Sequence, residues 1–308
     1  MTNLEKKRLS IAVIIVTYNE EIHIERCIKN TKKYSDEIYI VDSFSTDKTV
    51  KIAKSLKAKV LQNKWKNYSN QFSWALKKIK TKSKWILRLD ADEYLEEKLI
   101  CEISKKLPKL NNDIYGVNFK RKQIFMNKWI KYGGRYPLPL LRLWRNGHGK
   151  IEDRWMDEHI VIKKGKTTTF YNNFCDHNLN NLSFFIKKHD IYATREAIDV
   201  ILYEYKKNDY LNKKNTPFNV FIKRVLKEKF YNRLPLGLRS MFYFIYRYFL
   251  LLGFLDGKKG LIFHFLQGFW YRFLVDSKVI ELKNAIKNID KYKNICKKMS
   301  SVTGFEIK

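Results

Sequence analysis

The first hundred residues alternate continuous apolar runs with segments of helical periodicity. Four β-branched runs predict strands that are covered on both faces of a sheet, because such strands are apolar at every position. These runs span residues 11–16, 37–41, 59–62 and 85–89. Segments with apolar residues at helical spacing predict the intervening helices, and they span residues 20–33, 46–57 and 68–80. This alternation is typical of βαβ units and predicts an α/β fold with a mainly parallel sheet.

The pattern changes beyond this region. Longer strands and loops are expected over residues 115–170, and helices over residues 182–205 and much of the remaining chain. We therefore expect a first domain made of two halves, followed by a helical region rich in basic and aromatic residues. The expected bounds are 1–180 for the domain, 10–110 and 111–180 for its halves, and 181–308 for the helical region.

The fourth predicted strand runs directly into three acids, Asp90, Asp92 and Glu93. Unpaired carboxylates cost free energy when buried, and the cost rises when they lie side by side. Asp90 and Asp92 point the same way if the strand pattern continues, so both could bind one Mg²⁺ or Mn²⁺ together with a substrate diphosphate. The alternative is an acidic turn that caps a helix beginning near Leu95.

Polar residues also follow the first two strands. Thr17 to Glu20 come after the first, and Asp42, Ser43, Ser45 and Asp47 come after the second. In open α/β sheets ligands bind outside the carboxyl ends of the strands, so these residues are expected at one edge with the acids. For residues 45–47 the simpler interpretation, helix capping, is favoured.

Composition adds a preference for anionic partners. The chain has 308 residues, 45% of them hydrophobic, and a net charge of +31, which permits binding of nucleic acid, phospholipid or a phosphorylated substrate. Its four cysteines are scattered without metal-ligand spacing. The apolar run at residues 11–16 is too short for a signal peptide core, so we expect a cytoplasmic protein.

Three motifs together resemble the family 2 glycosyltransferases. They are Ile-Val-Thr-Tyr-Asn-Glu at 15–20, Val-Asp-Ser-Phe-Ser-Thr-Asp at 41–47 and Leu-Asp-Ala-Asp-Glu at 89–93. The resemblance implies the A-type glycosyltransferase fold, a Rossmann-like nucleotide-diphospho-sugar transferase sheet. Weaker downstream matches, such as Glu158-His159 and Asp176-His177, resemble a bacterial subgroup that adds glucose-like sugars to the inner core of lipopolysaccharide.

The resemblance assigns a nucleotide-sugar donor, with UDP-glucose as the expectation. Thr17, Asn19 and Glu20 would line the pocket for base and ribose, and Asp42 would accept a hydrogen bond from uracil or ribose. Arg135 would contact the donor or another phosphate, as would Arg142. For Arg145 we favour ordinary surface charge.

The acidic motif would hold the metal and the donor diphosphate. Asp92 is expected as the direct ligand of Mg²⁺ or Mn²⁺, with Asp90 a second ligand nearer the ribose. His177 could approach the metal, although a structural histidine is the favoured interpretation.

The resemblance also implies inversion at the anomeric carbon, which needs a base for the acceptor hydroxyl. Glu158 and Asp157 are the candidates, with Glu158 the better match. The alternative is a surface turn with solvated acids.

Two apolar windows stand out in the last third, residues 236–255 and 261–275. The first contains Arg239 and Arg247, which disfavours a spanning helix. Helices lying in a membrane interface and a buried helical hairpin are equally compatible with the pattern. A lipid-linked or lipopolysaccharide acceptor would favour the first, with the enzyme peripheral on the inner face of the plasma membrane.

Two other functions compete with glycosyl transfer. A basic nucleic-acid-binding protein would suit the lysine excess and 15% aromatic residues. However, acids at three strand ends would repel a phosphate backbone, so nucleic acid is not the expected partner. A phosphatase with an Asp-x-Asp motif is the second alternative, but two βα units precede the motif here.

Overall fold

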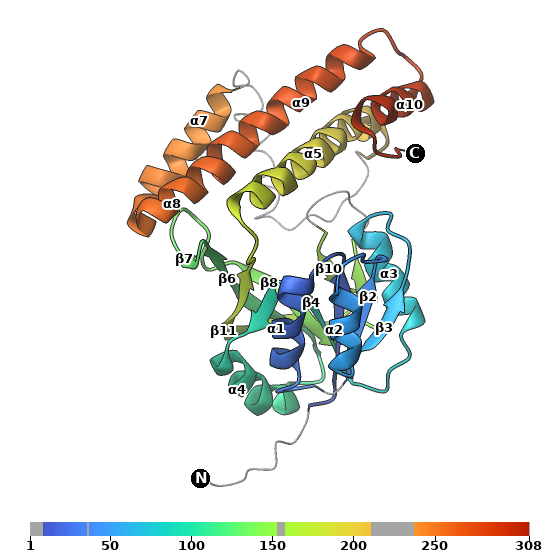
Figure 1. Cartoon of the computed structure of the whole chain (residues 1–308), viewed down its shortest axis with the longest axis vertical. Helices are drawn as coiled ribbons and strands as arrows, with labels where there is room; N and C mark the ends of the chain where they lie inside the picture. The colour runs from blue at the N-terminus through green and yellow to red at the C-terminus, as the bar shows by residue number, and fades with distance from the viewer. Residues whose placement is uncertain (1–8, 36, 153–157, 211–236, 308) are drawn as a thin grey trace. The chain divides into compact units, whose positions relative to one another are not determined.

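The computed structural model describes residues 9–35, 37–152, 158–210 and 237–307. The chain divides into two compact units, residues 1–180 and residues 181–308. Figure 1 shows that the first unit contains the sheet and that the second is helical.

Within the described residues, the first unit is built on a nine-stranded mixed sheet. Its strands are β1 (Ile11–Thr17), β2 (Glu37–Asp42), β3 (Lys59–Gln62), β4 (Trp85–Asp90), β5 (Glu93–Leu95), β6 (Ile114–Phe125), β7 (Lys128–Ile130), β8 (Pro139–Arg145) and β11 (Lys166–His177). Their order is β3-β2-β1-β4-β8-β6-β11-β5, with β7 paired to β6. Strands β3, β2, β1 and β4 are parallel, as are β6 and β11, whereas β8 is antiparallel to both β4 and β6. Strands β9 (Gly149–Ile151) and β10 (Ile160–Ile162) pair separately.

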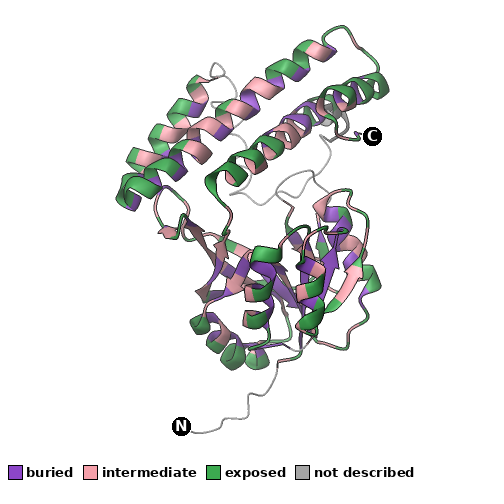
Figure 2. Cartoon of the chain, viewed as in Figure 1, coloured by how far each residue is buried: buried purple, intermediate pink, exposed green. Residues whose placement is uncertain are grey.

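Helices cover both faces of this sheet. They are α1 (Glu21–Thr31), α2 (Thr49–Ser55), α3 (Tyr68–Lys78), α4 (Glu97–Lys106) and the short η1 (Leu107–Lys109). Ile11, Val13 and Ile15 of β1 pack into a core with α1 and α4, whereas Ala12 and Ile14 pack with α3. Successive strand residues face opposite sides of a sheet, which explains why β1 is apolar from Ile11 to Val16. Figure 2 shows the resulting buried sheet.

The predicted α/β fold is confirmed, and each predicted strand and helix of the first hundred residues is present within a few residues of its expected bounds. The helix expected near Leu95 begins at Glu97, after the short strand β5, and its N-cap residue is Glu96. The acids therefore lie in a turn and a strand, and the helix-cap alternative does not apply to them.

The second unit is helical in its described residues. It contains α5 (Leu182–Tyr210), α7 (Leu238–Ile245), η3 (Tyr246–Leu250), η4 (Gly253–Asp256), α8 (Gly257–His264), η5 (Phe265–Trp270), α9 (Tyr271–Ile286) and α10 (Tyr292–Thr303). The long helices α5 and α9 pack together through buried residues that include Ala197, Ile201 and Val279. None of the helices in the described part of the chain is long and apolar enough to cross a bilayer.

Candidate functional site

Asp42 ends β2, and its side chain is fully buried. Its Oδ1 accepts hydrogen bonds from Thr17 Oγ1, at 3.0 Å, and from Ser45 Oγ. Its Oδ2 accepts from the Ser45 backbone N–H at 2.9 Å and from Gln62 Nε2 at 3.2 Å. A carboxylate has about four lone-pair positions, so groups of the protein occupy all of them. Asp42 thus fastens the ends of β1 and β2 together, and contact with a nucleotide requires one of these donors to leave.

The loops after β1 and β2 are joined by further hydrogen bonds. Asn19 has a left-handed backbone with φ of 53°, which asparagine tolerates better than most residues. Its N–H donates to Ser45 Oγ at 2.9 Å, and its Oδ1 accepts from the Thr46 N–H at 2.9 Å. The Glu20 N–H donates to Thr49 Oγ1 at 2.7 Å. The two loops therefore form one rigid wall at the sheet edge.

Asp47 shows that the capping interpretation of residues 45–47 was partly correct. Its Oδ1 accepts from the N–H of Thr49, the first residue of α2, at 2.9 Å. Its Oδ2 accepts from the N–H of Glu21, the first residue of α1, at 3.0 Å. One carboxylate thus serves the amino ends of both helices, where its charge is favourable.

Asp90 is the last residue of β4 and is one third exposed, with a side-chain accessibility of 33%. The Tyr68 hydroxyl donates to its Oδ1 at 2.6 Å, and Arg88 Nε donates to the same hydroxyl at 2.9 Å. Arg88 Nη1 also donates to the backbone oxygen of Glu158 at 3.1 Å. Arg88 therefore links the backbone of Glu158, the predicted base, to Asp90 through the Tyr68 hydroxyl.

Glu93 forms a buried ion pair beneath Asp90. Its Oε1 accepts from Arg142 Nη2 at 2.5 Å, and its Oε2 accepts from the Asp90 backbone N–H at 3.0 Å. Arg142 Nη1 lies 4.0 Å from Asp90 Oδ2. Burial raises the pKa of the Glu93 carboxyl, and the charge of Arg142 opposes this rise. This pair fixes the backbone from which Asp90 projects.

Asp92 lies in the turn between β4 and β5. Its Oδ2 accepts from Asn178 Nδ2 at 2.9 Å. Its backbone oxygen accepts from Arg26 Nη2 at 3.1 Å and from the His177 N–H at 3.0 Å. Among the described residues, Asp92 Oδ1 has no hydrogen-bond partner. The backbone of Asp92 is thus fixed while one carboxylate oxygen is available to a ligand.

His177 is held by protein groups on both ring nitrogens. Its Nδ1 faces Arg26 Nη1 at 3.2 Å, and its Nε2 faces Asn127 Oδ1 at 3.1 Å. Because arginine only donates, this arrangement places the proton on Nε2. Burial and the charge of Arg26 lower the pKa of His177. These contacts agree with the favoured interpretation of a structural histidine.

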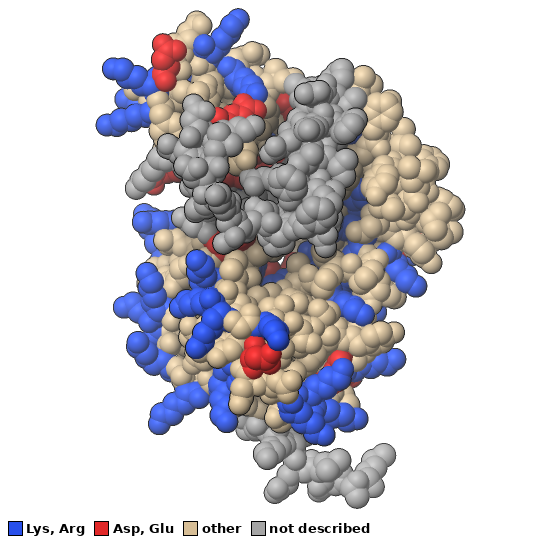
Figure 3. All heavy atoms as spheres, turned by 180° about the vertical axis from the view of Figure 1, so that it is seen from behind, with Lys and Arg blue, Asp and Glu red and all other residues tan. Residues whose placement is uncertain are grey.

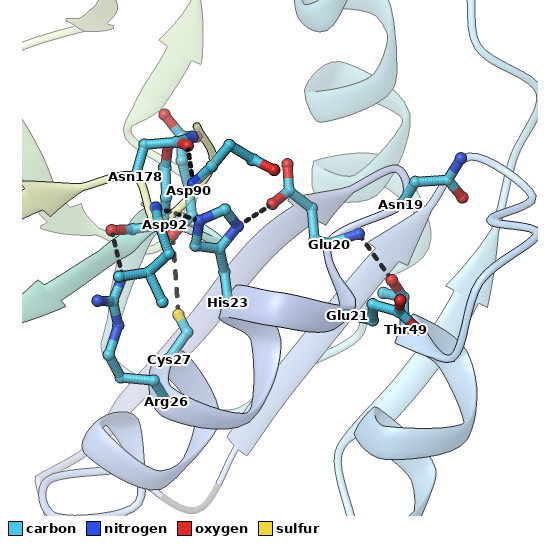
Figure 4. Close-up of polar contacts among 12 residues, drawn as sticks. Asn19, Glu20, Glu21, His23, Arg26, Cys27, Thr49, Asp90, Asp92 and Asn178 are labelled. Atoms are coloured by element: carbon cyan, nitrogen blue, oxygen red, sulfur yellow. Dashed lines mark hydrogen bonds and ion pairs between the residues drawn. The ribbon is translucent and has the colours of Figure 1, made fainter. Parts of the chain in front are cut away.

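Figure 4 shows a second histidine near the acids, His23 of α1. This residue is fully buried. Its Nδ1 lies 2.6 Å from Glu20 Oε2, and its Nε2 accepts from the Leu179 N–H at 2.8 Å. His23 thereby connects the loop after β1 to residues 178–180, and Asn178 in that segment contacts Asp92.

The acidic edge has the chemistry that Mg²⁺ or Mn²⁺ requires, although it does not form a cage. The described residues contain no group of three or more metal-binding side chains. These ions are commonly held by one or two carboxylates together with substrate phosphate and water. The partly exposed Asp90 and the open oxygen of Asp92 fit that pattern.

The other predicted site residues are placed less directly. Asp157 lies outside the described residues. Arg135 donates through Nη2 to Gln123 Oε1, and its backbone N–H donates to the oxygen of Tyr132. Arg145 is half-buried, its Nε donates to the backbone oxygen of Ile114 at 2.8 Å, and its guanidinium packs on the Trp85 ring.

Sequence reasoning missed the residues that support the acids. Tyr68, Arg88, Asn178 and His23 were assigned no role. Arg88 carried a usable signal, because it is the charged residue inside the apolar run of β4, and a charge in a strand covered on both faces needs partners. The others come from distant segments whose proximity only the fold creates.

This combination of fold and site defines a class of protein. A mixed α/β sheet, whose parallel strands end in an acidic pair beside two joined polar loops, is the A-type nucleotide-sugar transferase architecture. The model of the family described as glycosyl transferase family 2 matches residues 12–170. The chain belongs to this family and is a glycosyltransferase that uses a nucleotide-sugar donor, which decides against the phosphatase and nucleic-acid-binding alternatives.

Several known proteins are similar to this chain. An uncharacterized glycosyltransferase of Rickettsia typhi is 28% identical over 299 residues, covering 95% of each chain. One of Rickettsia bellii is 44% identical over 115 residues, and the match spans only 38% of that protein. A mannosyltransferase from Pyrobaculum calidifontis, solved with GDP-Man and Mn²⁺, aligns over 91% of this chain and 88% of its own, with a TM-score of 0.50 and 14% identity. At that identity the likeness shows the fold alone.

We predict that Arg142→Met destabilises the protein by about 3–5 kcal/mol, because it leaves the buried Glu93 carboxylate without its partner. Urea unfolding of the full chain measures this change. The matched control is Lys29→Met, which removes an exposed pair with Glu25 and should cost about 0.5 kcal/mol or less. A loss below about 1 kcal/mol for Arg142→Met would mean that the pair does not hold the acidic edge.

Proposed function

We propose that the chain is an inverting glycosyltransferase that moves a hexose, with glucose expected, from a UDP-linked donor to a bacterial surface glycan. The observation that carries this proposal is the convergence of three strand ends. The loop after β1, the loop after β2 and the Asp90–Asp92 turn lie at one edge of the sheet. A nucleotide, its diphosphate and the transferred sugar would occupy that edge in this order.

The two joined loops would form the nucleotide pocket. Asn19 is exposed, and its amide NH₂ has no partner among the described residues, so it can donate to a base or ribose. Thr17 and Asp42 would not contact the nucleotide directly; their hydrogen bond would hold the two loops in position. Tyr18 and Phe44 are more than half exposed beside them and offer rings for stacking on a base. Glu20 would complete the wall, and Arg135 would contact phosphate.

Asp92 and Asp90 would hold Mg²⁺ or Mn²⁺ together with the donor diphosphate. The bound ion would offset the charge that develops on the leaving diphosphate. The complex of the Pyrobaculum calidifontis mannosyltransferase with GDP-Man and Mn²⁺ supports such a site in this fold. The buried Arg142, whose Nη1 lies 4.0 Å from Asp90 Oδ2, would place a positive charge beside this site.

Glu158 would take the proton from the acceptor hydroxyl. Arg88 supports this role because it links the Glu158 backbone to the Tyr68–Asp90 pair. A base at this position would be held close to the anomeric carbon of a donor bound at Asp90. Asp157 remains the second candidate on sequence grounds.

The proposed acceptor is a lipid-linked or lipopolysaccharide core glycan, as the resemblance to the inner-core glucosyltransferases implies. Such an acceptor is made at the inner membrane, so we propose a peripheral position on its cytoplasmic face. The net charge of +31 would favour an anionic leaflet.

The donor is tested by thermal stabilisation with UDP, GDP and CMP, each with and without Mn²⁺. Only UDP is expected to raise the melting temperature, and the rise should be larger with Mn²⁺, because a ligand that binds the native state stabilises it. A UDP shift that ignores Mn²⁺ would refute the metal assignment and spare the nucleotide pocket. A shift with GDP alone would refute the choice of nucleotide.

Replacing the proposed base separates chemistry from binding. Glu158→Gln should lower kcat by about 10²–10⁴-fold, as expected for loss of general base catalysis, and leave the UDP-induced thermal shift unchanged. The matched control is Glu97→Gln, an exposed carboxylate that pairs with Lys33. A kcat for Glu158→Gln within twofold of the wild type would assign the base to another residue.

A further inference from the structure

The second unit exposes a concentration of large apolar side chains. Fourteen of the 29 exposed large hydrophobic residues in the described chain lie between residues 238 and 273. We call their surface, formed by α7, η3, η4, α8, η5 and the start of α9, the apolar surface. Its members include Phe242, Tyr246, Phe249, Leu250, Phe254 and Leu255. Figure 3 shows a broad area without charged side chains where this part of the chain is in view. Large apolar side chains exposed together in this way mark a site of interaction with a membrane or another protein.

The two arginines that disfavoured a membrane-spanning helix, Arg239 and Arg247, are directed inward. Arg247 is 3% exposed, and its Nη2 lies 3.3 Å from His264 Nδ1. His264 Nε2 in turn lies 3.2 Å from Asp256 Oδ2, and both residues are buried. Arg239 donates through Nε to Asp276 Oδ2 at 2.6 Å. Each arginine charge is thus turned to an internal partner instead of the apolar surface.

A glycine permits the close packing that buries this network. A Cβ built on Gly260 would lie 2.2 Å from the Cβ of Asp256, far inside van der Waals contact. Gly260 therefore lets the Asp256 side chain lie against α8, where it reaches His264. The Arg247, His264 and Asp256 side chains are therefore buried, while Phe249, Phe254 and other large apolar side chains of this stretch are exposed.

The exposed charges on this stretch have one sign. Lys258 and Lys259 at the start of α8 are exposed, whereas the acid beside them, Asp256, is 2% exposed. Apolar aromatic side chains next to lysines are typical of helices that lie in a membrane interface. The lysines complement an anionic leaflet. A twofold dimer through the same patch would place four lysines, two from each copy, in one interface, which disfavours a second copy as the occupant.

We infer that the apolar surface inserts into the interface of an anionic membrane, with Lys258 and Lys259 at the phosphate headgroups. The inserted side chains reach the boundary between headgroups and acyl chains, and no helix within the described residues is long and apolar enough to cross the bilayer. These residues would attach the enzyme to the membrane, where the proposed acceptor is found. This attachment does not depend on the donor chemistry, because it rests on the second unit alone.

The test is sedimentation of the full chain with vesicles. Wild type should sediment with phosphatidylethanolamine and phosphatidylglycerol vesicles. The double variant Phe249→Glu with Leu250→Glu should bind at least about tenfold more weakly, because two apolar side chains no longer enter the interface. The double variant Lys258→Gln with Lys259→Gln should lose about fivefold per lysine on these vesicles and nothing on pure phosphatidylcholine.

Val302→Glu is the matched control, because Val302 is exposed on α10 outside the apolar surface. It should bind vesicles like the wild type. The melting temperature and UDP-induced shift of every variant are measured in parallel, which separates misfolding or failure of the donor site from failure of this inference. Wild type that does not sediment with vesicles would overturn it. So would self-association without vesicle binding that the Phe249–Leu250 variant abolishes, since that result assigns the surface to a second copy.

Discussion

The buried ion pair between Glu93 and Arg142 is the constraint on which the acidic edge depends. The chain leaves β4 at Asp90 and enters β5 at Glu93, but β5 pairs with β11 and not with β4. The Asp90–Asp92 turn therefore crosses between separate strands of the sheet. Glu93 anchors this crossing by accepting from the Asp90 N–H and from Arg142 of β8. This anchoring holds the carboxylates of Asp90 and Asp92 at the edge of the sheet, outside the core.

Much of the fold follows from the sequence because the apolar pattern of a doubly covered strand is unambiguous. β1 is apolar from Ile11 to Val16, and the polar residues that follow fall at the sheet edge as expected. Long-range pairing could not be predicted in the same way. β5 is three residues long and has no periodic signal, and its partner β11 lies some 80 residues further along the chain.

The candidate site likewise contains residues that the sequence predicts and residues that only the fold brings together. Thr17, Asn19, Asp42, Asp90 and Asp92 were identified because strand ends in parallel sheets converge. Their supporting side chains come from α1, α3 and residues 177–179, and only packing brings them together. In the second unit the two apolar windows could be recognised in the sequence. The internal pairing of Arg239 and Arg247 could not, because it depends on helix breaks at Leu252 and Gly257.

Binding of Mn²⁺ in the presence of UDP, followed by electron paramagnetic resonance of the free ion, tests the central assignment most directly. Wild type and the control Asp113→Asn, which changes an exposed carboxylate paired with Lys166, should deplete the free Mn²⁺ signal equally. Asp92→Asn should bind Mn²⁺ at least about tenfold more weakly while retaining its fold. Equal Mn²⁺ affinity for Asp92→Asn and wild type would contradict the assignment of the acidic edge as the metal and diphosphate site.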